Sequence, residues 1–250
     1  MSRIGVVTGA TQGLGFALAE GLAQQLAPGD IVYLTGRDAE RVDAAVERVT
    51  RPRAELRGHV LDVGDGAAVD AFADEIRARH GGGVDIVFSN AAARLTPGTP
   101  STELVGPFVS TNNLGATRML RAFAPILRPG GRLLVVASDF GYLRRLPTHL
   151  QGSFDTDAMT LDDVDTIMLA WRDAVVEGRA AEEGWPDWIN IPSCPGLIDT
   201  PASRPWFNDM SGAQTPAEAA ATPLRLALDP AADLRLYGEL VQFGKIIPWC

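Results

Sequence analysis

The sequence predicts an α/β protein with a doubly wound parallel sheet, folded as one domain over residues 1–250. Short β-branched runs alternate with longer stretches in which apolar residues recur every three or four positions, as strands and helices do when they alternate along a chain. The first run leads through a glycine-rich turn directly into a helical stretch. Neither an internal repeat nor a shift in composition indicates a domain boundary.

The turn Thr8–Gly15 (Thr-Gly-Ala-Thr-Gln-Gly-Leu-Gly) follows the apolar run Ile4–Val7 and opens a helical stretch. Gly9 permits a sharp turn, Gly13 lets the backbone approach a pyrophosphate, and Gly15 lets the helix pack closely. The free N–H groups at the helix start suit phosphates. The turn therefore predicts a Rossmann-like dinucleotide-binding unit; the alternative is a glycine-rich turn that binds no nucleotide.

The first half of the chain continues this alternation. Residues 31–35 and 84–88 are β-branched runs that predict strands, and a third strand is predicted within residues 54–63. Helices are predicted between them over residues 38–50 and 67–80, and a run of three glycines ends the second helix.

The second half contains one long irregular segment, residues 139–160. A helix over residues 111–127 is predicted to end at a Pro-Gly-Gly stop, before a strand over residues 132–137. The remaining predicted elements are helices over residues 161–183 and 215–228 and strands over residues 188–191 and 238–243.

Composition excludes several classes of function. A net charge of -9 without a Lys/Arg-rich block argues against a nucleic-acid partner or an anionic membrane surface. Cys194 and Cys250 give neither a disulfide framework nor a metal-ligand spacing, so we expect a reducing compartment and no metal. Without a membrane-spanning apolar run or a signal-peptide pattern, we expect a cytoplasmic protein.

The tip of the second predicted strand bears on the choice of cofactor. A carboxylate at this position is typical of NAD sites, whereas an arginine accommodates the 2′-phosphate of NADP. The tip reads Thr35-Gly36-Arg37, so we expect NADP(H) to be favoured over NAD(H). The alternative is that Asp38 only caps the next helix and that Arg37 is solvated.

Together these motifs resemble the short-chain dehydrogenase/reductase family over nearly the whole chain. Further motifs that carry the resemblance are Leu61-Asp62-Val63, Ser89-Asn90-Ala91-Ala92, Asn112-Asn113-Leu114-Gly115, Ser138, and Pro195-Gly196 with Thr200 behind it. The resemblance implies cofactor contacts at Gly9, Thr11, Gln12, Gly13, Leu14, Gly15, Arg37, Asp62, Val63, Asn90, Ala91, Pro195, Gly196 and Thr200.

The resemblance also implies an active site. It makes Asn113 the family's active-site asparagine and Ser138 the substrate-binding serine. The excursion that ends Glu182-Glu183-Gly184-Trp185-Pro186 looks like the monomeric carbonyl reductase branch of the family.

The chain departs from the family pattern at the catalytic pair. In the family, the tyrosine of a Tyr-x-x-x-Lys pair protonates the substrate oxygen, and the lysine lowers the tyrosine's pKa and holds the nicotinamide ribose. Here the one lysine is Lys245 and the three tyrosines are Tyr33, Tyr142 and Tyr237, so no such pair exists. The helix expected to carry it is missing too, and residues 139–187 form an atypical excursion in its place.

The helical stretch 161–183 is the only one available between the fifth and sixth predicted strands. Parallel strands need a crossover of a dozen residues or more. We therefore expect this stretch to take the crossover position, with its stripe on the sheet or on a neighbouring helix; the stripe comprises Val164, Met168, Trp171 and Val175. The alternative is an outer lid, which would expose a large apolar face.

Hydride transfer still needs a group that meets the developing alkoxide. Ser138 and Asn113 can donate hydrogen bonds or order water, and Tyr142 and His149 are candidate acids. The alternatives make Tyr142 a loop anchor and His149 a surface residue.

Three functions compete. The first is an atypical NADP(H)-binding oxidoreductase with a degenerate active site, acting on a small-molecule carbonyl or alcohol. The second is a redox-neutral enzyme, a cyclase, dehydratase or isomerase, in which nicotinamide is absent or structural. The third is a non-catalytic cofactor-binding protein. A monomer or a dimer fits any of them.

Overall fold

The computed structural model of the chain describes residues 2–138, 142–154, 158–185, 197–229 and 234–248. Its centre is a five-stranded parallel sheet in the order β3-β2-β1-β4-β5. The strands are β1 (Ile4–Val7), β2 (Ile31–Gly36), β3 (Glu55–Val60), β4 (Val84–Ser89) and β5 (Leu127–Val135). From β1 the sheet extends through β2 to β3 on one side and through β4 to β5 on the other. The prediction of a doubly wound parallel sheet is therefore confirmed.

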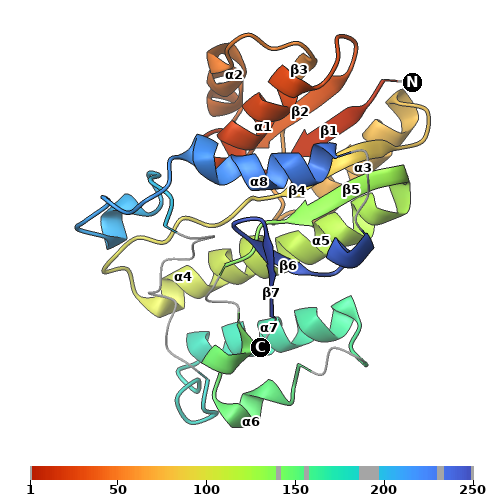
Figure 1. The fold of residues 1–250 in the computed structure, drawn as a ribbon. Helices are drawn as coiled ribbons and strands as arrows, with labels where there is room; N and C mark the ends of the chain where they lie inside the picture. The colour runs from red at the N-terminus through yellow and green to blue at the C-terminus, as the bar shows by residue number, and fades with distance from the viewer. Residues whose placement is uncertain (1, 139–141, 155–157, 186–196, 230–233, 249–250) are drawn as a thin grey trace.

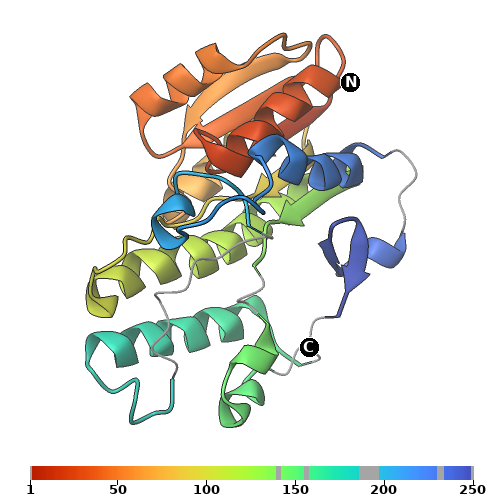
Figure 2. The ribbon, with the colours of Figure 1, turned by 60° about the vertical axis from the view of Figure 1, so that its left-hand side comes forward.

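Helices cover both faces of this sheet (Figures 1 and 2). On one face, α1 (Gly13–Gln25), α2 (Ala39–Arg48) and α8 (Pro216–Leu228) share one apolar core with the strands. On the other face, α3 (Gly66–Arg79) and α5 (Leu114–Phe123) enclose a second core. The central strands β1 and β2 are buried along their whole length, which is why they read as continuous apolar runs rather than as alternating ones.

A further layer lies beyond α5. It consists of α4 (Ser101–Phe108), the π-helical turn η1 (Val109–Asn113) and α7 (Leu161–Val176). Trp171 of α7 is buried against Val105 and Val109, so the apolar stripe of α7 lies on a neighbouring helix, one of the two positions that the sequence allows. The residues that would complete the crossover, including the predicted strand 188–191, lie outside the described residues.

Polar contacts also attach α7 to α5. The Oγ1 atom of Thr117 donates to Asp165 at 2.7 Å, and Arg121 pairs with Asp165 at 2.7 Å and with Asp162 at 2.5 Å. The helix begins at a capping box formed by Thr160 and Asp163.

The helix predicted over residues 111–127 is longer and less regular than expected. It begins at Ser101 and passes through η1, and η2 (Ala124–Ile126) forms its 3-10 end. Pro107 removes one helical N–H donor, and the wider turn that follows keeps the chain helical. The Pro-Gly-Gly stop lies inside β5, where the register against β4 shifts, and does not precede the strand.

The last predicted strand, residues 238–243, does not belong to the parallel sheet. Instead β6 (Leu240–Gln242) pairs antiparallel with β7 (Lys245–Ile247) in a separate hairpin. The two residues between them, Phe243 and Gly244, both have positive φ (48° and 77°), which is the backbone of a two-residue hairpin turn. The chain therefore reverses direction after the three residues of β6, and β7 returns alongside β6.

The remaining elements are short. They are η4 (Leu143–Arg145), α6 (Thr148–Gln151), η5 (Arg204–Trp206) and η6 (Leu234–Leu236). Across the described ranges, no helix combines the length and the apolar character needed to cross a membrane.

Candidate functional site

The glycine turn lies where the winding of the sheet changes direction. It follows β1, and the segment Asn90–Ala93 follows β4, the neighbour of β1 in the sheet. Connections from these two strands leave toward opposite faces, which opens a crevice at their carboxyl ends. Ligands of open α/β sheets bind in this crevice. The fold therefore places the predicted nucleotide turn at the expected end of the sheet.

Thr8 and Asn90 lock the two strand ends together. The buried Oγ1 atom of Thr8 accepts hydrogen bonds from the backbone N–H groups of Asn90 (2.9 Å) and Ala91 (3.0 Å). In return, the side-chain amide of Asn90 donates to the carbonyl oxygen of Thr8 at 2.9 Å. Asn90 therefore has a structural role in shaping the turn. Thr8 was not among the predicted site residues, although it stands in the motif.

The glycines of the turn meet specific steric demands. Gly9 has φ +62°, and a Cβ atom there would lie 2.7 Å from Cα of Ala91. Gly13 has φ +57°. A Cβ atom on Gly15 would lie 2.5 Å from the side-chain nitrogen of Asn90 and would also strike the carbonyl oxygen of Gly9. Gly15 thus permits close packing of α1 on the turn itself.

The start of α1 differs from those of α2, α3, α7 and α8. Asp38, Asp65, Thr160 and Thr215 each accept a backbone N–H at the start of α2, α3, α7 and α8. The N-cap of α1, Gln12, makes no such bond, and the first turn contains no acidic side chain. Donors that a protein side chain would otherwise satisfy are left for another acceptor. An anionic phosphate suits this position.

Arginines border the same turn. Arg37 is exposed directly after β2, and Asp38 caps α2 by accepting the backbone N–H of Arg41; both observations fit either interpretation of this strand tip. Arg41 donates to the side-chain oxygen of Gln12 at 2.9 Å. Arg48 donates to the carbonyl oxygen of Thr11 at 3.1 Å, and its guanidinium lies 4.0 Å from the centroid of the Phe16 ring. The sequence analysis missed Arg41 and Arg48.

Two further segments contain predicted site residues. The loop after β3 contains Asp62 and Val63, and the Asp62 carboxylate accepts the backbone N–H of Gly64 at 2.8 Å. On the other side, Thr200 lies against Gly13, where a Cβ atom would meet the Thr200 methyl group at 3.2 Å. Thr200 belongs to a hydrogen-bonded turn with Ser203. The predicted contacts Pro195 and Gly196 lie outside the described residues.

The asparagine pair sits in η1, between α4 and α5. Asn112 accepts the backbone N–H of Ala93 at 2.8 Å and so joins η1 to the loop after β4. The Oδ1 atom of Asn113 is buried and has no hydrogen-bond partner among the residues that the structure describes. Thus Asn112 is a positioning contact that the sequence analysis did not single out. The side-chain oxygen of Asn113 can accept a further hydrogen bond.

The remaining catalytic candidates are placed differently. Ser138 is half-buried three residues beyond β5, next in the sheet to β4. Tyr142 is buried, with the Arg144 guanidinium 3.8 Å from its ring centroid. His149 is exposed on α6, against Gly184, and both views draw α6 beyond α7 and away from β4 and β5 (Figures 1 and 2). Within the described ranges, His149 makes no hydrogen bond to the predicted site residues.

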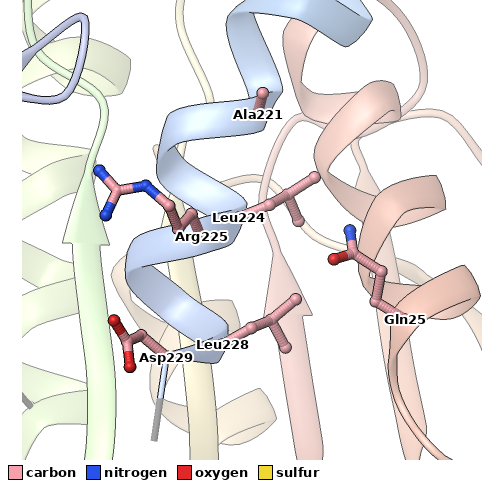
Figure 3. Close-up of a pocket in the computed structure, with 6 residues that line it drawn as sticks. All are labelled: Gln25, Ala221, Leu224, Arg225, Leu228 and Asp229. Carbon is pink, nitrogen blue, oxygen red and sulfur yellow. The ribbon is translucent and has the colours of Figure 1, made fainter. Parts of the chain in front are cut away.

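A hollow of about 460 Å3 lies elsewhere, at the opposite end of α1 (Figure 3). Leu224 and Leu228 point from α8 toward α1, whereas Arg225 and Asp229 point to the other side. Its lining residues are Gln25, Ala221, Leu224, Arg225, Leu228 and Asp229. Because Gln25 ends a 13-residue helix that starts at the glycine turn, the hollow is about 18 Å from that turn. It contains none of the predicted site residues, so we do not assign it to the site. Within the described ranges, no His, Cys, Asp and Glu group has the arrangement of a metal site.

The parallel sheet wound in both directions, with a glycine turn at its switch point, defines a Rossmann-like α/β protein. Residues 3–148 match the short chain dehydrogenase family, and the chain belongs to this family.

Similar proteins agree with this assignment. The chain is 28% identical to carbonyl reductase [NADPH] 1 of Sus scrofa over 281 residues, covering 99% of this chain and 94% of the relative. Among solved structures, salutaridine reductase of Papaver somniferum has a TM-score of 0.74 at 23% identity, covering 90% of this chain and 95% of that one. An alcohol dehydrogenase of Thermococcus sibiricus, complexed with 5-hydroxy-NADP, has a TM-score of 0.59 at 26% identity and covers 90% of each chain.

Proposed function

We propose that this chain is an NADP(H)-dependent oxidoreductase that acts on a small carbonyl compound or alcohol, with an active site that lacks the Tyr-x-x-x-Lys pair. The observation that carries the proposal is the uncapped start of α1 behind a glycine turn with positive φ at Gly9 and Gly13, bordered by arginines. The similarity to carbonyl reductase [NADPH] 1 over almost the whole chain supports it.

The residues present fit a dinucleotide. The N–H groups at Gly13, Leu14 and Gly15 would receive the pyrophosphate, and Thr11 and Gln12 shape the turn in front of them. Arg37 and Arg41 would meet a 2′-phosphate, and Asp62 and Val63 would border the adenine. On the other side of the turn, Asn90, Ala91 and Thr200 would line the path toward the nicotinamide, together with Pro195 and Gly196. When bound, the cofactor supplies a hydride.

In this proposal, the proton for the substrate oxygen comes from a group other than the tyrosine of a Tyr-x-x-x-Lys pair, because the sequence has no such pair. The alignment with the Sus scrofa carbonyl reductase extends over 281 positions, whereas this chain has 250 residues, so at least 31 aligned positions have no counterpart here. A gap of this size accommodates the helix that the sequence lacks. Ser138 and Asn113 would then orient the substrate oxygen or a water molecule. Tyr142 is the candidate acid closest in sequence to Ser138, and His149 is the less favoured one, because it lies on α6 against Gly184 and away from β4 and β5.

A redox-neutral reaction is the second candidate, a cyclisation, dehydration or isomerisation. The absence of a Tyr-x-x-x-Lys pair from the sequence favours it, because orientation by Ser138 and Asn113 does not require that pair. A non-catalytic cofactor-binding protein is the third.

A panel of aldehydes and ketones incubated with the protein and NADPH separates these functions. Loss of nicotinamide absorbance in step with product supports the oxidoreductase, and Tyr142→Phe then tests the acid. Product without loss of absorbance supports the redox-neutral enzyme. NADPH binding without any product across the panel supports the non-catalytic protein.

Arg37→Ala tests the preference for the 2′-phosphate. We expect the variant to bind NADPH at least tenfold more weakly while its affinity for NADH stays the same, because only NADPH carries the phosphate. Arg53→Ala is the matched control: Arg53 is also exposed but precedes β3, at the amino ends of the strands, whereas Arg37 follows β2 at their carboxyl ends. Equal losses of affinity for both cofactors would contradict the assignment of Arg37.

A further inference from the structure

Arg118 joins two segments that the proposed function places at different ends of the cofactor site. It lies on α5, and its Nη1 atom is 2.8 Å from the carbonyl oxygen of Gly64 and 3.3 Å from that of Val63. The same atom is 3.3 Å from the carbonyl oxygen of Ser110, inside the π-helical turn η1. One guanidinium nitrogen therefore reaches the adenine-side loop and the asparagine-bearing turn at once.

Packing around Arg118 leaves little room for either segment to shift. A Cβ atom on Gly115 would lie 2.7 Å from the Val63 side chain. The hydroxyl of Ser110 donates to the carbonyl oxygen of Gly64 at 3.4 Å, and a Cβ atom on Gly64 would meet that hydroxyl at 3.1 Å. The loop and η1 are in direct contact, and the charged guanidinium of Arg118 donates hydrogen bonds to both segments.

Carbonyl oxygens near a helix irregularity need an external donor. The N–H of Leu114 bonds to the carbonyl oxygen of Val109, five residues back, so the ordinary ladder is interrupted in η1. A guanidinium gives stronger hydrogen bonds to such carbonyls than a neutral donor does. The rigid plane of the guanidinium also fixes the direction of the Nη1 N–H groups, which a flexible ammonium does less well.

We propose that Arg118 is a positioning residue that couples the adenine-side loop, Asp62–Gly64, to η1, so that occupation of the adenine end orders Asn112 and Asn113 at the other end. This inference rests on the proposed binding of NADP(H). It does not make Arg118 a cofactor contact. Coupling of this kind needs a physical link between the two segments, and the three carbonyl contacts supply it.

The test uses adenosine 2′,5′-bisphosphate, a probe that carries only the adenine end of NADP(H). Hydrogen exchange of the amides of residues 109–115 is measured with and without the probe in the wild type, Arg118→Met and Arg118→Lys. We expect the probe to slow exchange in this segment at least threefold in the wild type, to have no such effect in Arg118→Met, and to have a partial effect in Arg118→Lys. Affinity for NADPH should fall at least threefold in Arg118→Met.

Arg121→Met is the matched control, because Arg121 lies on the same helix but contacts α7. It should lower thermal stability while the probe still protects residues 109–115. Protection in Arg118→Met equal to that in the wild type overturns the inference while the proposed function stands. If the wild type binds neither NADPH nor the probe, the proposed function fails first and the coupling fails with it.

Discussion

Thr8→Val removes the hydroxyl that locks the glycine turn to the loop after β4 while nearly preserving the shape of the side chain. Thr8 is fully buried, and the substitution leaves the N–H groups of Asn90 and Ala91 without their acceptor. The carbonyl oxygen of Phe88 loses only a weak partner at 3.3 Å and keeps the Thr8 N–H at 3.0 Å. Two unpaired, partly buried donors cost about 2–3 kcal/mol of unfolding free energy.

Thr8→Ser is the control, because it keeps the hydroxyl and loses one methyl group, a loss of about 1 kcal/mol. Urea unfolding followed by tryptophan fluorescence and by circular dichroism measures both variants and tests whether the transitions coincide. We expect the valine variant to be less stable than the serine variant by about 1–2 kcal/mol and to bind NADPH more weakly. A valine variant as stable as the serine variant would refute the proposed lock.

Three further predictions concern other parts of the molecule. Gly15→Ala should abolish NADPH binding, because its Cβ atom would strike Asn90 and the Gly9 carbonyl group, whereas Gly106→Ala, with open space around it, should bind normally. Burial lowers the pKa of His59 below its ordinary value, so the unfolded chain takes up the proton first as the pH falls. Stability should therefore be full above about pH 6.5 and decline below it, and His59→Gln should flatten this slope; an unchanged slope would exclude His59 as the source. Asp165→Asn should lower the unfolding free energy by about 1–2 kcal/mol and loosen α7, measured by urea unfolding, and Asp162→Asn, at an exposed position, should change it by less than about 0.5 kcal/mol. Equal effects of the two would contradict the role given to Asp165.

The parts of the fold that could be predicted are those in which the local pattern and the overall fold agree. The run Ile4–Val7, the glycine turn and the start of α1 form one contiguous motif, and the structure reproduces it almost residue for residue. The stripe on α7 was predicted to be buried, but periodicity alone does not say whether a helix or a sheet covers it. In the structure, helix α4 and η1 cover the stripe.

Other features depend on contacts between distant residues. Arg41 and Arg48 reach the glycine turn across 29 and 37 residues of sequence, and no local pattern indicates such contacts. The strand over residues 238–243 was predicted without a stated partner, and the turn at Phe243 and Gly244 decides its pairing. Asn112 and Asn113 are adjacent, so the sequence alone does not separate the one that ties η1 to Ala93 from the other.

The binding of a nucleotide at the glycine turn is the central claim, and calorimetric titration of the wild-type protein with NADPH and with NADH tests it most directly. The account predicts that NADPH binds with a dissociation constant in the micromolar range or below, and that NADH binds at least about tenfold more weakly, a difference of about 1.4 kcal/mol. Binding of neither cofactor below millimolar concentration would contradict it.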